Sequence, residues 1–171
     1  MPIVAQVFYF IIYLILQVVL VQQMVLFDVA FCFLYLGFLL MLPFEAGSIR
    51  LMLMGLLMGL CVDIFYNSLG IHAAASVFIM YARPHVVSLI SPRGGYEAWM
   101  TPKLKIMGFE WFSLYSVILI FLHHLLLFFI EAGGFSNFFY TLLKVLASTA
   151  FTYVVIVIIQ YLFYSSSRRS L

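Results

Sequence analysis

Long runs of apolar residues dominate the chain, and they have the length that membrane crossing requires. The hydrocarbon core of a bilayer is about 30 Å thick, so a helix needs about 20 residues to cross it. Residues 3–42 form one apolar tract of twice that length, with the polar cluster Gln22, Gln23 and Asp28 near its middle. The runs lack the alternating polar pattern of barrel strands, and backbone in lipid must satisfy its own hydrogen bonds. The pattern predicts an all-α integral membrane protein.

Six helices fit the apolar runs. Pro43 should end the second helix, because proline cannot continue the hydrogen-bond ladder, and residues 67–70, Asn-Ser-Leu-Gly, have the composition of a turn. Residues 91–108 contain two prolines, two adjacent glycines and four charges, and form the sizeable hydrophilic loop. We expect a single transmembrane domain, 1–171, with helices over about 3–22, 26–42, 49–66, 71–90, 109–130 and 138–163. A single fused span over the first two helices is the alternative.

The positive charges predict how this bundle is oriented. Cytoplasmic loops of membrane proteins carry an excess of Lys and Arg. With six spans, the basic residues in the loops and at the helix ends fall on the side that carries both termini, and the three opposite turns hold none. These residues are Arg50, Arg93, Lys103, Lys105, Arg168 and Arg169. Both termini should therefore be cytoplasmic.

Composition agrees with a bilayer environment and excludes several functions. Of the 171 residues, 67% are hydrophobic and 8% charged, against about 25% charged in an average soluble domain. The net charge of +2 is too small to indicate a nucleic-acid partner. Cys32 and Cys61 both fall in apolar runs, where a thiol behaves as a small hydrophobe, so no disulfide is expected. The first segment lacks signal-peptide features and should remain in the protein.

Small and acidic residues share one face of the third predicted helix. Gly55, Gly59 and Asp63 repeat every four residues, and the glycine pair is a small-xxx-small pattern that allows two helix backbones to approach closely. We expect this face to contact another helix, either within the chain or on a partner. The alternative is that two glycines occur by chance in an apolar helix.

Further polar residues line the fourth and sixth predicted helices. His72, Ser76 and Arg83 lie on one side of the fourth, and Lys144, Ser148 and Thr152 form a stripe on the sixth. Ionisable groups inside a membrane are costly and usually pair with one another. We expect Asp63 to pair with Lys144 or with His72 in the bundle interior. Alternatively Lys144 and Arg83 extend to the nearest interface, which Asp63 is too short to do.

No pattern in the sequence points to catalysis, a metal or a cofactor. His123 and His124 are adjacent, so on a helix they point about 100° apart and cannot chelate a metal as residues four apart would. There is no phosphate-binding glycine loop, nucleophile elbow or carboxylate pair. The sequence therefore favours a protein that is not an enzyme and that acts by contact.

Residues 55–97, GLLMGLCVDIFYNSLGIHAAASVFIMYARPHVVSLISPRGGYE, resemble the MreD family of rod shape-determining proteins in its Bacteroidetes-type form. The matching pieces are G-L-x-x-D-I-F around Asp63, L-G-x-H-A-A-A at 69–75, R-P at 83–84 and S-P-R-G-G-Y-E at 91–97. HHLLLFFIEAGGFSNFF at 123–139 is similar to the family's last hairpin. The likeness extends over all six spans, although the first two add only generic hydrophobicity.

The resemblance implies a non-enzymatic component of the bacterial inner membrane. Such a protein binds MreC and belongs, with MreB, RodA and a penicillin-binding transpeptidase, to the complex that guides side-wall peptidoglycan synthesis and rod shape. We expect the membrane-embedded faces to bind MreC's transmembrane helix, and Arg93, Lys103 and Lys105 to contact cytoplasmic partners. Association of two copies of the chain into a homodimer is a further alternative.

The family's six-helix architecture is similar to that of the substrate-binding subunits of energy-coupling-factor vitamin transporters. The alternative function is therefore a small-molecule-binding transporter subunit. That function requires a polar pocket open to the outer face, near Asp63, His72 and Lys144.

Overall fold

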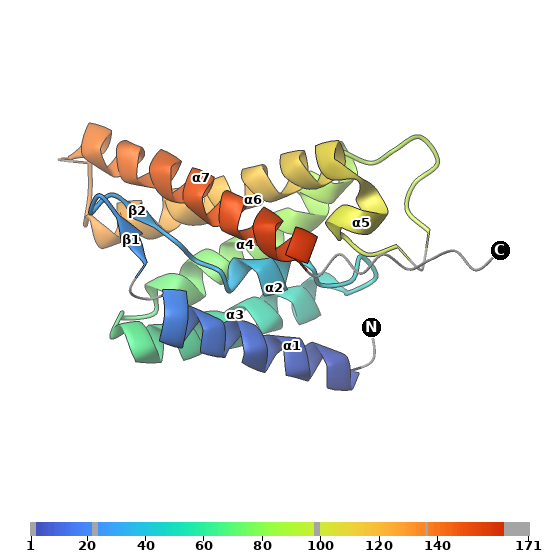
Figure 1. Ribbon diagram of the computed structural model, residues 1–171, viewed down its shortest axis with the longest axis horizontal. Helices are drawn as coiled ribbons and strands as arrows, with labels where there is room; N and C mark the ends of the chain where they lie inside the picture. The colour runs from blue at the N-terminus through green and yellow to red at the C-terminus, as the bar shows by residue number, and fades with distance from the viewer. Residues whose placement is uncertain (1–2, 22–23, 98–99, 136, 163–171) are drawn as a thin grey trace.

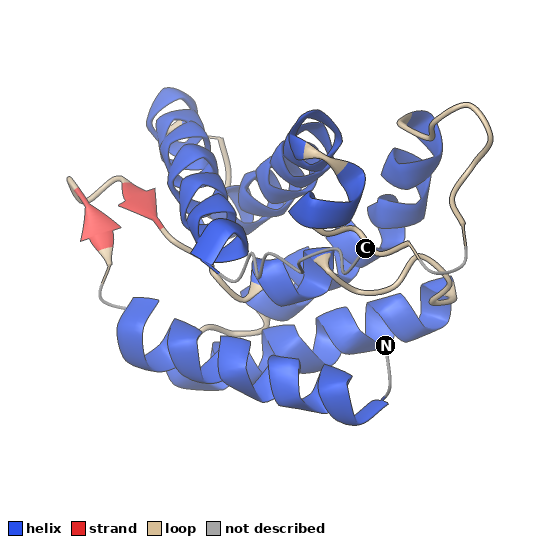
Figure 2. Ribbon diagram, turned by 45° about the vertical axis from the view of Figure 1, so that its right-hand side comes forward, coloured by secondary structure: helices blue, strands red, loops and turns tan. Residues whose placement is uncertain are grey.

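The computed structural model describes residues 3–21, 24–97, 100–135 and 137–162 (Figure 1). Most of these residues are helical, as predicted. In chain order the elements are α1 (Ile3–Ile15), the π-helix η1 (Leu16–Val21), β1 (Val25–Leu26), β2 (Ala30–Phe31), α2 (Leu36–Leu40), α3 (Ser48–Tyr66), α4 (Ile71–Leu89), α5 (Leu104–Met107), α6 (Phe109–Glu131) and α7 (Phe138–Leu162). The last helix, α7, crosses α1 and α3 at an angle (Figures 1 and 2).

Four helical stretches in the described part of the chain are long and apolar enough to cross a membrane, which supports a multi-pass membrane protein. They are Ile3–Val21, Ser48–Tyr66, Phe109–Glu131 and Phe138–Leu162. α4 has 19 residues, but its inner face carries buried His72, Ser76 and Arg83. The observed bounds of α3, α4, α6 and α7 agree with the expected ones to within one residue. Residues 91–108, expected as a loop, also contain the single helical turn α5.

The predicted helix over residues 26–42 is wrong, so the expected count of six helices is not confirmed. β1 and β2 form a short antiparallel hairpin, with Val25 opposite Phe31, and α2 has only five residues (Figure 2). The tip of this hairpin holds Phe27 and Asp28 at φ of 54° and 57°, a conformation that ends any helix there. Gln22 and Gln23, which were expected to break the apolar tract, lie outside the described residues.

This second segment nevertheless passes through the bundle. It leads from the β-hairpin at one end, between α1 and α3 on one side and α6 and α7 on the other, to α2 near the middle (Figures 1 and 2). Every residue from 32 to 40 is buried. Non-helical backbone at membrane depth is tolerated only where protein surrounds it, because lipid offers no hydrogen bonds. Its burial therefore explains how the crossing avoids a full helix.

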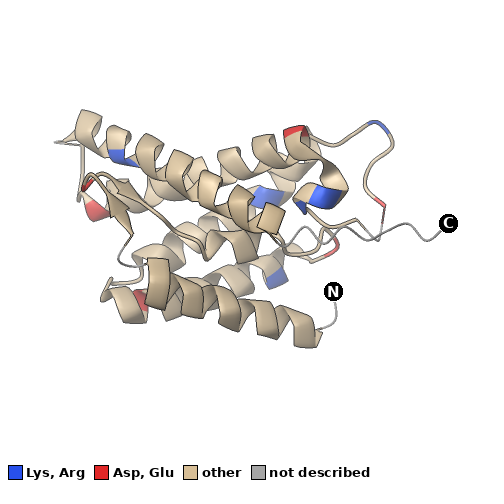
Figure 3. Cartoon of the chain, in the orientation of Figure 1, with Lys and Arg blue, Asp and Glu red and all other residues tan. Residues whose placement is uncertain are grey.

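The alternating passes leave the start of α1 and the end of α7 at the same end of the bundle (Figure 1). Most Lys and Arg residues of the described chain gather at that end (Figure 3). Lys144 is the exception at the opposite end, since it lies in the second turn of α7. Arg168 and Arg169, which contributed to the predicted orientation, lie outside the described residues.

α3 and α4 form a tight hairpin whose contact is made by glycines. A Cβ built on Gly59 would lie 2.4 Å from Ala73 Cα, and one built on Gly55 would lie 2.8 Å from the Ser76 carbonyl oxygen. The turn that joins the helices uses Asn67 in the left-handed conformation, at φ 55°. The face that carries Gly55 and Gly59 is thus a helix contact, as predicted, and the helix that it meets belongs to the same chain.

Candidate functional site

The candidate site is the irregular second crossing and the polar side chains that hold it. Three side chains of neighbouring helices bind its backbone at one end. Ser148 Oγ accepts a hydrogen bond from the Phe31 amide at 2.9 Å, and Thr152 Oγ1 accepts one from the Phe33 amide at 3.0 Å. Both hydroxyls come from the stripe on α7 that the sequence indicates. They replace, for this segment, the backbone partners that a helix would supply.

Gln17, which lies in η1, provides the third support. Its side-chain oxygen accepts from the Tyr35 amide at 3.2 Å, while its Nε2 donates to the Cys32 carbonyl at 3.3 Å. The same Nε2 also donates to the Tyr66 hydroxyl at 2.6 Å. A π-helix places side chains differently from an α-helix and is often found where a helix serves a local purpose. Gln17 therefore connects the first helix to the irregular crossing.

Arg83 and Tyr115 hold the other end of the crossing, after α2. Arg83 is only 2% exposed, and its guanidinium donates to the Leu42 and Pro43 carbonyls and, at 2.6 Å, to the Tyr115 hydroxyl. Tyr115 in turn donates to the Leu40 carbonyl at 2.8 Å. A guanidinium offers five donors in a rigid fork, which suits several carbonyl acceptors at once. Arg83 is therefore an internal support and does not extend to the interface.

Asp63 caps the helix that follows its own. Its carboxylate accepts from the backbone amides of His72 at 3.0 Å and Ala73 at 2.9 Å, which are free donors of the first turn of α4. Ser68 Oγ donates to it at 2.6 Å, and His72 Nδ1 lies 3.0 Å away. A helix N-terminus favours a negative charge. Of the two partners expected for Asp63, the structure has His72.

Lys144 does not reach Asp63, so the alternative pairing is wrong. Its ammonium lies 3.3 Å from the Glu131 carboxylate at the end of α6. It also lies 4.9 Å from the ring centre of Phe31 and 4.7 Å from that of Phe128. The aromatic faces and the nearby acid stabilise the cation at the rim of the bundle. Lys144 thus extends toward the interface, as the alternative interpretation has it.

Histidine and aromatic rings surround the irregular crossing at its centre. The ring centre of Phe33 lies 5.3 Å from that of His72 and 5.2 Å from that of His124, and the Tyr35 hydroxyl contacts His123 Nε2 at 2.7 Å. No group of three or more His, Cys, Asp or Glu residues in the described ranges has the arrangement of a metal site. The ring contacts pack this cluster against the crossing.

The basic loop residues are divided between two environments. Arg93 is exposed in the loop after α4. Lys103 and Lys105 instead line a cavity of about 480 Å³ between α1 and α7. Lys103 is only partly exposed, so it is held against the bundle at this position. The two lysines expected to meet cytoplasmic partners therefore also border this cavity, Lys105 with an exposed side chain.

The sequence did not identify Gln17 and Tyr115 as functional residues. It also did not predict which atoms Ser148 and Thr152 on α7 bind. A signal existed for Gln17, because a lone amide in the middle of an apolar span needs a buried partner. For Tyr115 there was none, since it is one of 11 tyrosines in the chain. The partners of all four are backbone atoms of a segment predicted to be helical, and helical backbone would have needed no such partners.

Replacement of Thr152 by Val tests the support of the crossing. Valine keeps the shape but leaves the Phe33 amide without its acceptor in the bundle interior. We expect Thr152→Val to lower the free energy of unfolding by about 1–2 kcal/mol. The measurement is the thermal unfolding midpoint of the detergent-solubilised protein.

Thr149→Val is the matched control for this experiment. Thr149 is also buried in α7, and its hydroxyl has no hydrogen-bond partner among the described residues. This control should leave the midpoint unchanged or raise it. Equal losses in the two variants would show that Thr152 does not support the crossing.

Comparison of the chain with models of protein families, with curated proteins and with solved structures gave no match in any of the three.

Proposed function

We propose that the protein is a non-enzymatic inner-membrane component of the bacterial rod complex, with both termini cytoplasmic, that binds MreC and supports side-wall peptidoglycan synthesis. The proposal starts from the sequence resemblance of residues 55–97 to the MreD family. Asp63, Gly59 and Arg83, which carry much of that resemblance, all have internal supporting contacts in the structure. A protein whose intramembrane polar groups are used to hold its own shape is suited to act through its surface.

The tip of the β-hairpin is the single observation that best supports a function through contact with a partner protein. Phe27 is 95% exposed and lies at φ 54°, a conformation that costs a residue of its size on the order of 1–3 kcal/mol. An exposed aromatic side chain held in a strained turn contributes little to the fold itself. Strain of this kind is typical of functional positions. We assign the tip to MreC binding at the end of the bundle opposite the termini.

The glycine face is no longer a candidate for MreC binding. Gly55 and Gly59 are covered by α4 of the same chain, so their replacement would disrupt the hairpin before it could affect a partner. The expected contact with MreC's transmembrane helix must therefore use surfaces that face outward.

Phe27→Asn separates binding from folding. Asparagine adopts positive φ more readily than phenylalanine, so the variant should unfold at the same temperature as the parent or higher. We expect recovery of MreC with the tagged chain from detergent extracts to fall at least fivefold. Leu57→Ala, at an exposed position of α3, is the control and should leave recovery unchanged. Unchanged recovery with Phe27→Asn would contradict the assignment of the tip.

Depletion of the protein in its rod-shaped host tests the function itself. The proposal predicts spherical cells that regain rod shape when the parent chain is restored. Normal shape combined with a vitamin requirement would support the transporter alternative. That alternative needs a cavity lined by Asp63, His72 and Lys144, whereas Asp63 and His72 bind one another and the 480 Å³ cavity has other lining residues.

A further inference from the structure

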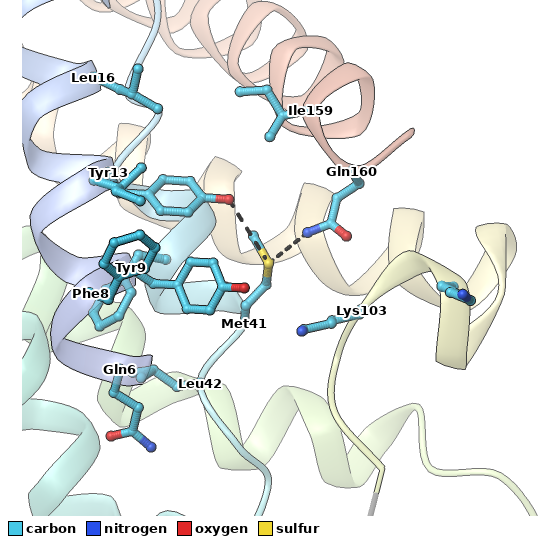
Figure 4. Close-up of a pocket in the computed structure, with 13 residues that line it drawn as sticks. Gln6, Phe8, Tyr9, Tyr13, Leu16, Met41, Leu42, Lys103, Ile159 and Gln160 are labelled. Atoms are coloured by element: carbon cyan, nitrogen blue, oxygen red, sulfur yellow. Dashed lines mark hydrogen bonds between the residues drawn. The ribbon is translucent and has the colours of Figure 1, made fainter. Parts of the chain in front are cut away.

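A cavity of about 480 Å³ separates α1 from α7 near the end of the bundle that carries the basic residues (Figure 4). Its volume lies within the range of small-molecule sites, about 300–1,000 Å³. α1 packs against α2 and α3, while α7 packs against α6, β2 and α5, so the two helices form opposite walls and α2 forms the floor. Phe8 and Tyr9 on the α1 wall are 61% and 40% exposed, so the space opens sideways to the surroundings of the bundle. We call it the α1–α7 groove.

The lining of the groove changes from polar to apolar along its length. Gln6 lies near the start of α1 and Leu16 ten residues later, a distance of about 15 Å along a helix, which is half the thickness of the hydrocarbon core. Gln6, Gln160, Lys103 and Lys105 line it, and the first two lie near the ends of their helices at the basic end of the bundle. The deeper lining on α1 and α2 is mainly apolar and includes Ile12, Leu16 and Phe38, and on α7 the apolar Ile159 lies next to Gln160.

Polar groups converge on the space at its outer part. Figure 4 shows the Lys103 ammonium and the Tyr9 hydroxyl directed into the groove from two different elements, while the Gln160 amide nitrogen donates to Met41 Sδ on the groove floor. None of the described residues that line the groove is acidic. The net charge of the lining is therefore positive, and its side-chain nitrogen and hydroxyl donors suit an anion with several acceptor oxygens.

We propose that the α1–α7 groove binds an anionic phospholipid. The phosphate lies at Lys103 and Lys105, and an acyl chain lies between α1 and α7 against Ile12 and Ile159. A phospholipid has an anionic head group and apolar acyl chains. It therefore matches a groove whose lining is basic and polar at one end and apolar farther into the bundle. The inference needs only that the bundle spans a bilayer, so it stands apart from the proposed role in cell shape.

Lipid titration of the purified chain tests the proposal. The delipidated protein in detergent is titrated with phosphatidylglycerol or with phosphatidylcholine, and bound lipid is counted by native mass spectrometry. We expect one phosphatidylglycerol to bind at least tenfold more tightly than phosphatidylcholine. Lys103→Gln should weaken phosphatidylglycerol binding about fivefold, the effect of one lysine near an anionic lipid. Arg93→Gln removes the same charge from an exposed loop and should leave the affinity unchanged.

A second variant tests the place of the acyl chain. Ile159→Trp fills the apolar part of the groove without altering its charge, and should abolish the single tight site while the thermal unfolding midpoint stays near that of the parent. Equal affinity for the two lipids, equal losses in Lys103→Gln and Arg93→Gln, or tight binding by Ile159→Trp would overturn the proposal. A photoreactive residue at position 159 that captures protein in place of lipid in native membranes would also overturn it.

Discussion

Replacement of Gly59 by Ser should lower the free energy of unfolding by about 3 kcal/mol. The added Cβ would lie 2.4 Å from the Cα and 2.6 Å from the amide nitrogen of Ala73. Both are backbone atoms, so no side-chain rotation can relieve the clash and α3 and α4 must separate. Overpacking of this kind costs typically 1–3 kcal/mol, with the upper end expected where backbone must move. The thermal unfolding midpoint in detergent, followed by circular dichroism, measures the loss.

Gly47→Ser is the matched control for the glycine contact. Gly47 precedes the same helix, has a negative φ, and a Cβ built on it meets no atom within 4 Å. Serine is also a favourable residue at the start of a helix, so this variant should be as stable as the parent or slightly more stable. If Gly59→Ser unfolds at the temperature of Gly47→Ser, the close approach of α3 and α4 does not exist.

Replacement of Arg83 by Met should cost about 3 kcal/mol. Methionine fills most of the space of the arginine stem but donates no hydrogen bond. The carbonyls of Leu42 and Pro43 lose their charged donor, and the Tyr115 hydroxyl loses its partner, at a position where the Arg83 and Tyr115 side chains are buried. Hydrogen bonds to charged groups contribute about 1.5–3 kcal/mol each. The variant no longer bears the desolvation cost of a buried charge, which offsets part of that loss.

Arg83→Lys and Arg50→Met complete this experiment. Lysine keeps the charge but cannot span the three acceptors that the guanidinium fork reaches, so Arg83→Lys should also unfold at a lower temperature than the parent. Arg50 is exposed in the first turn of α3, and its replacement by Met should have little effect. A parent-like midpoint for both Arg83 variants would show that the end of the crossing is held by other contacts.

The long helices were predictable because their signals are local. Each apolar run from α3 onward is bounded by a residue that ends helices or favours turns, such as Pro43 and the 67–70 turn, and the span length follows from bilayer thickness. The glycine spacing in α3 likewise defines a face without knowledge of the partner helix. Whether that partner was α4 or another protein depended on packing, and the sequence left both possibilities open.

The second crossing was not predictable from its own residues. A continuous apolar run does not distinguish a buried strand from a buried helix, and periodicity is absent from residues 30–42. Its conformation depends on Thr152, Ser148 and Arg83, which lie 40 or more residues away along the chain. Aromatic residues at alternate positions, Phe31, Phe33 and Tyr35, are typical of extended segments and were the one local indication.

Asp63, His72, Ser76, Arg83 and Ser148 lie inside the bundle as predicted, whereas Lys144 lies at its rim, and most of their partners were unexpected. The prediction that ionisable groups in the spans pair with one another holds for Asp63 and His72. Arg83 instead binds backbone carbonyls, which exist as acceptors only because the crossing is irregular. Because residues 26–42 were predicted to be helical, the backbone partners of side chains on α4, α6 and α7 could not be predicted either.

The two cysteines provide the most direct measurement of the central claim, that the second crossing is non-helical backbone held by side chains of neighbouring helices. Cys32 lies in the crossing between β2 and α2, and Cys61 lies within α3. Protein labelled with ¹³C at cysteine Cα, solubilised in detergent, should give one signal in the helical range and one outside it, with Cys61→Ser removing the helical signal. Two helical signals would contradict the account.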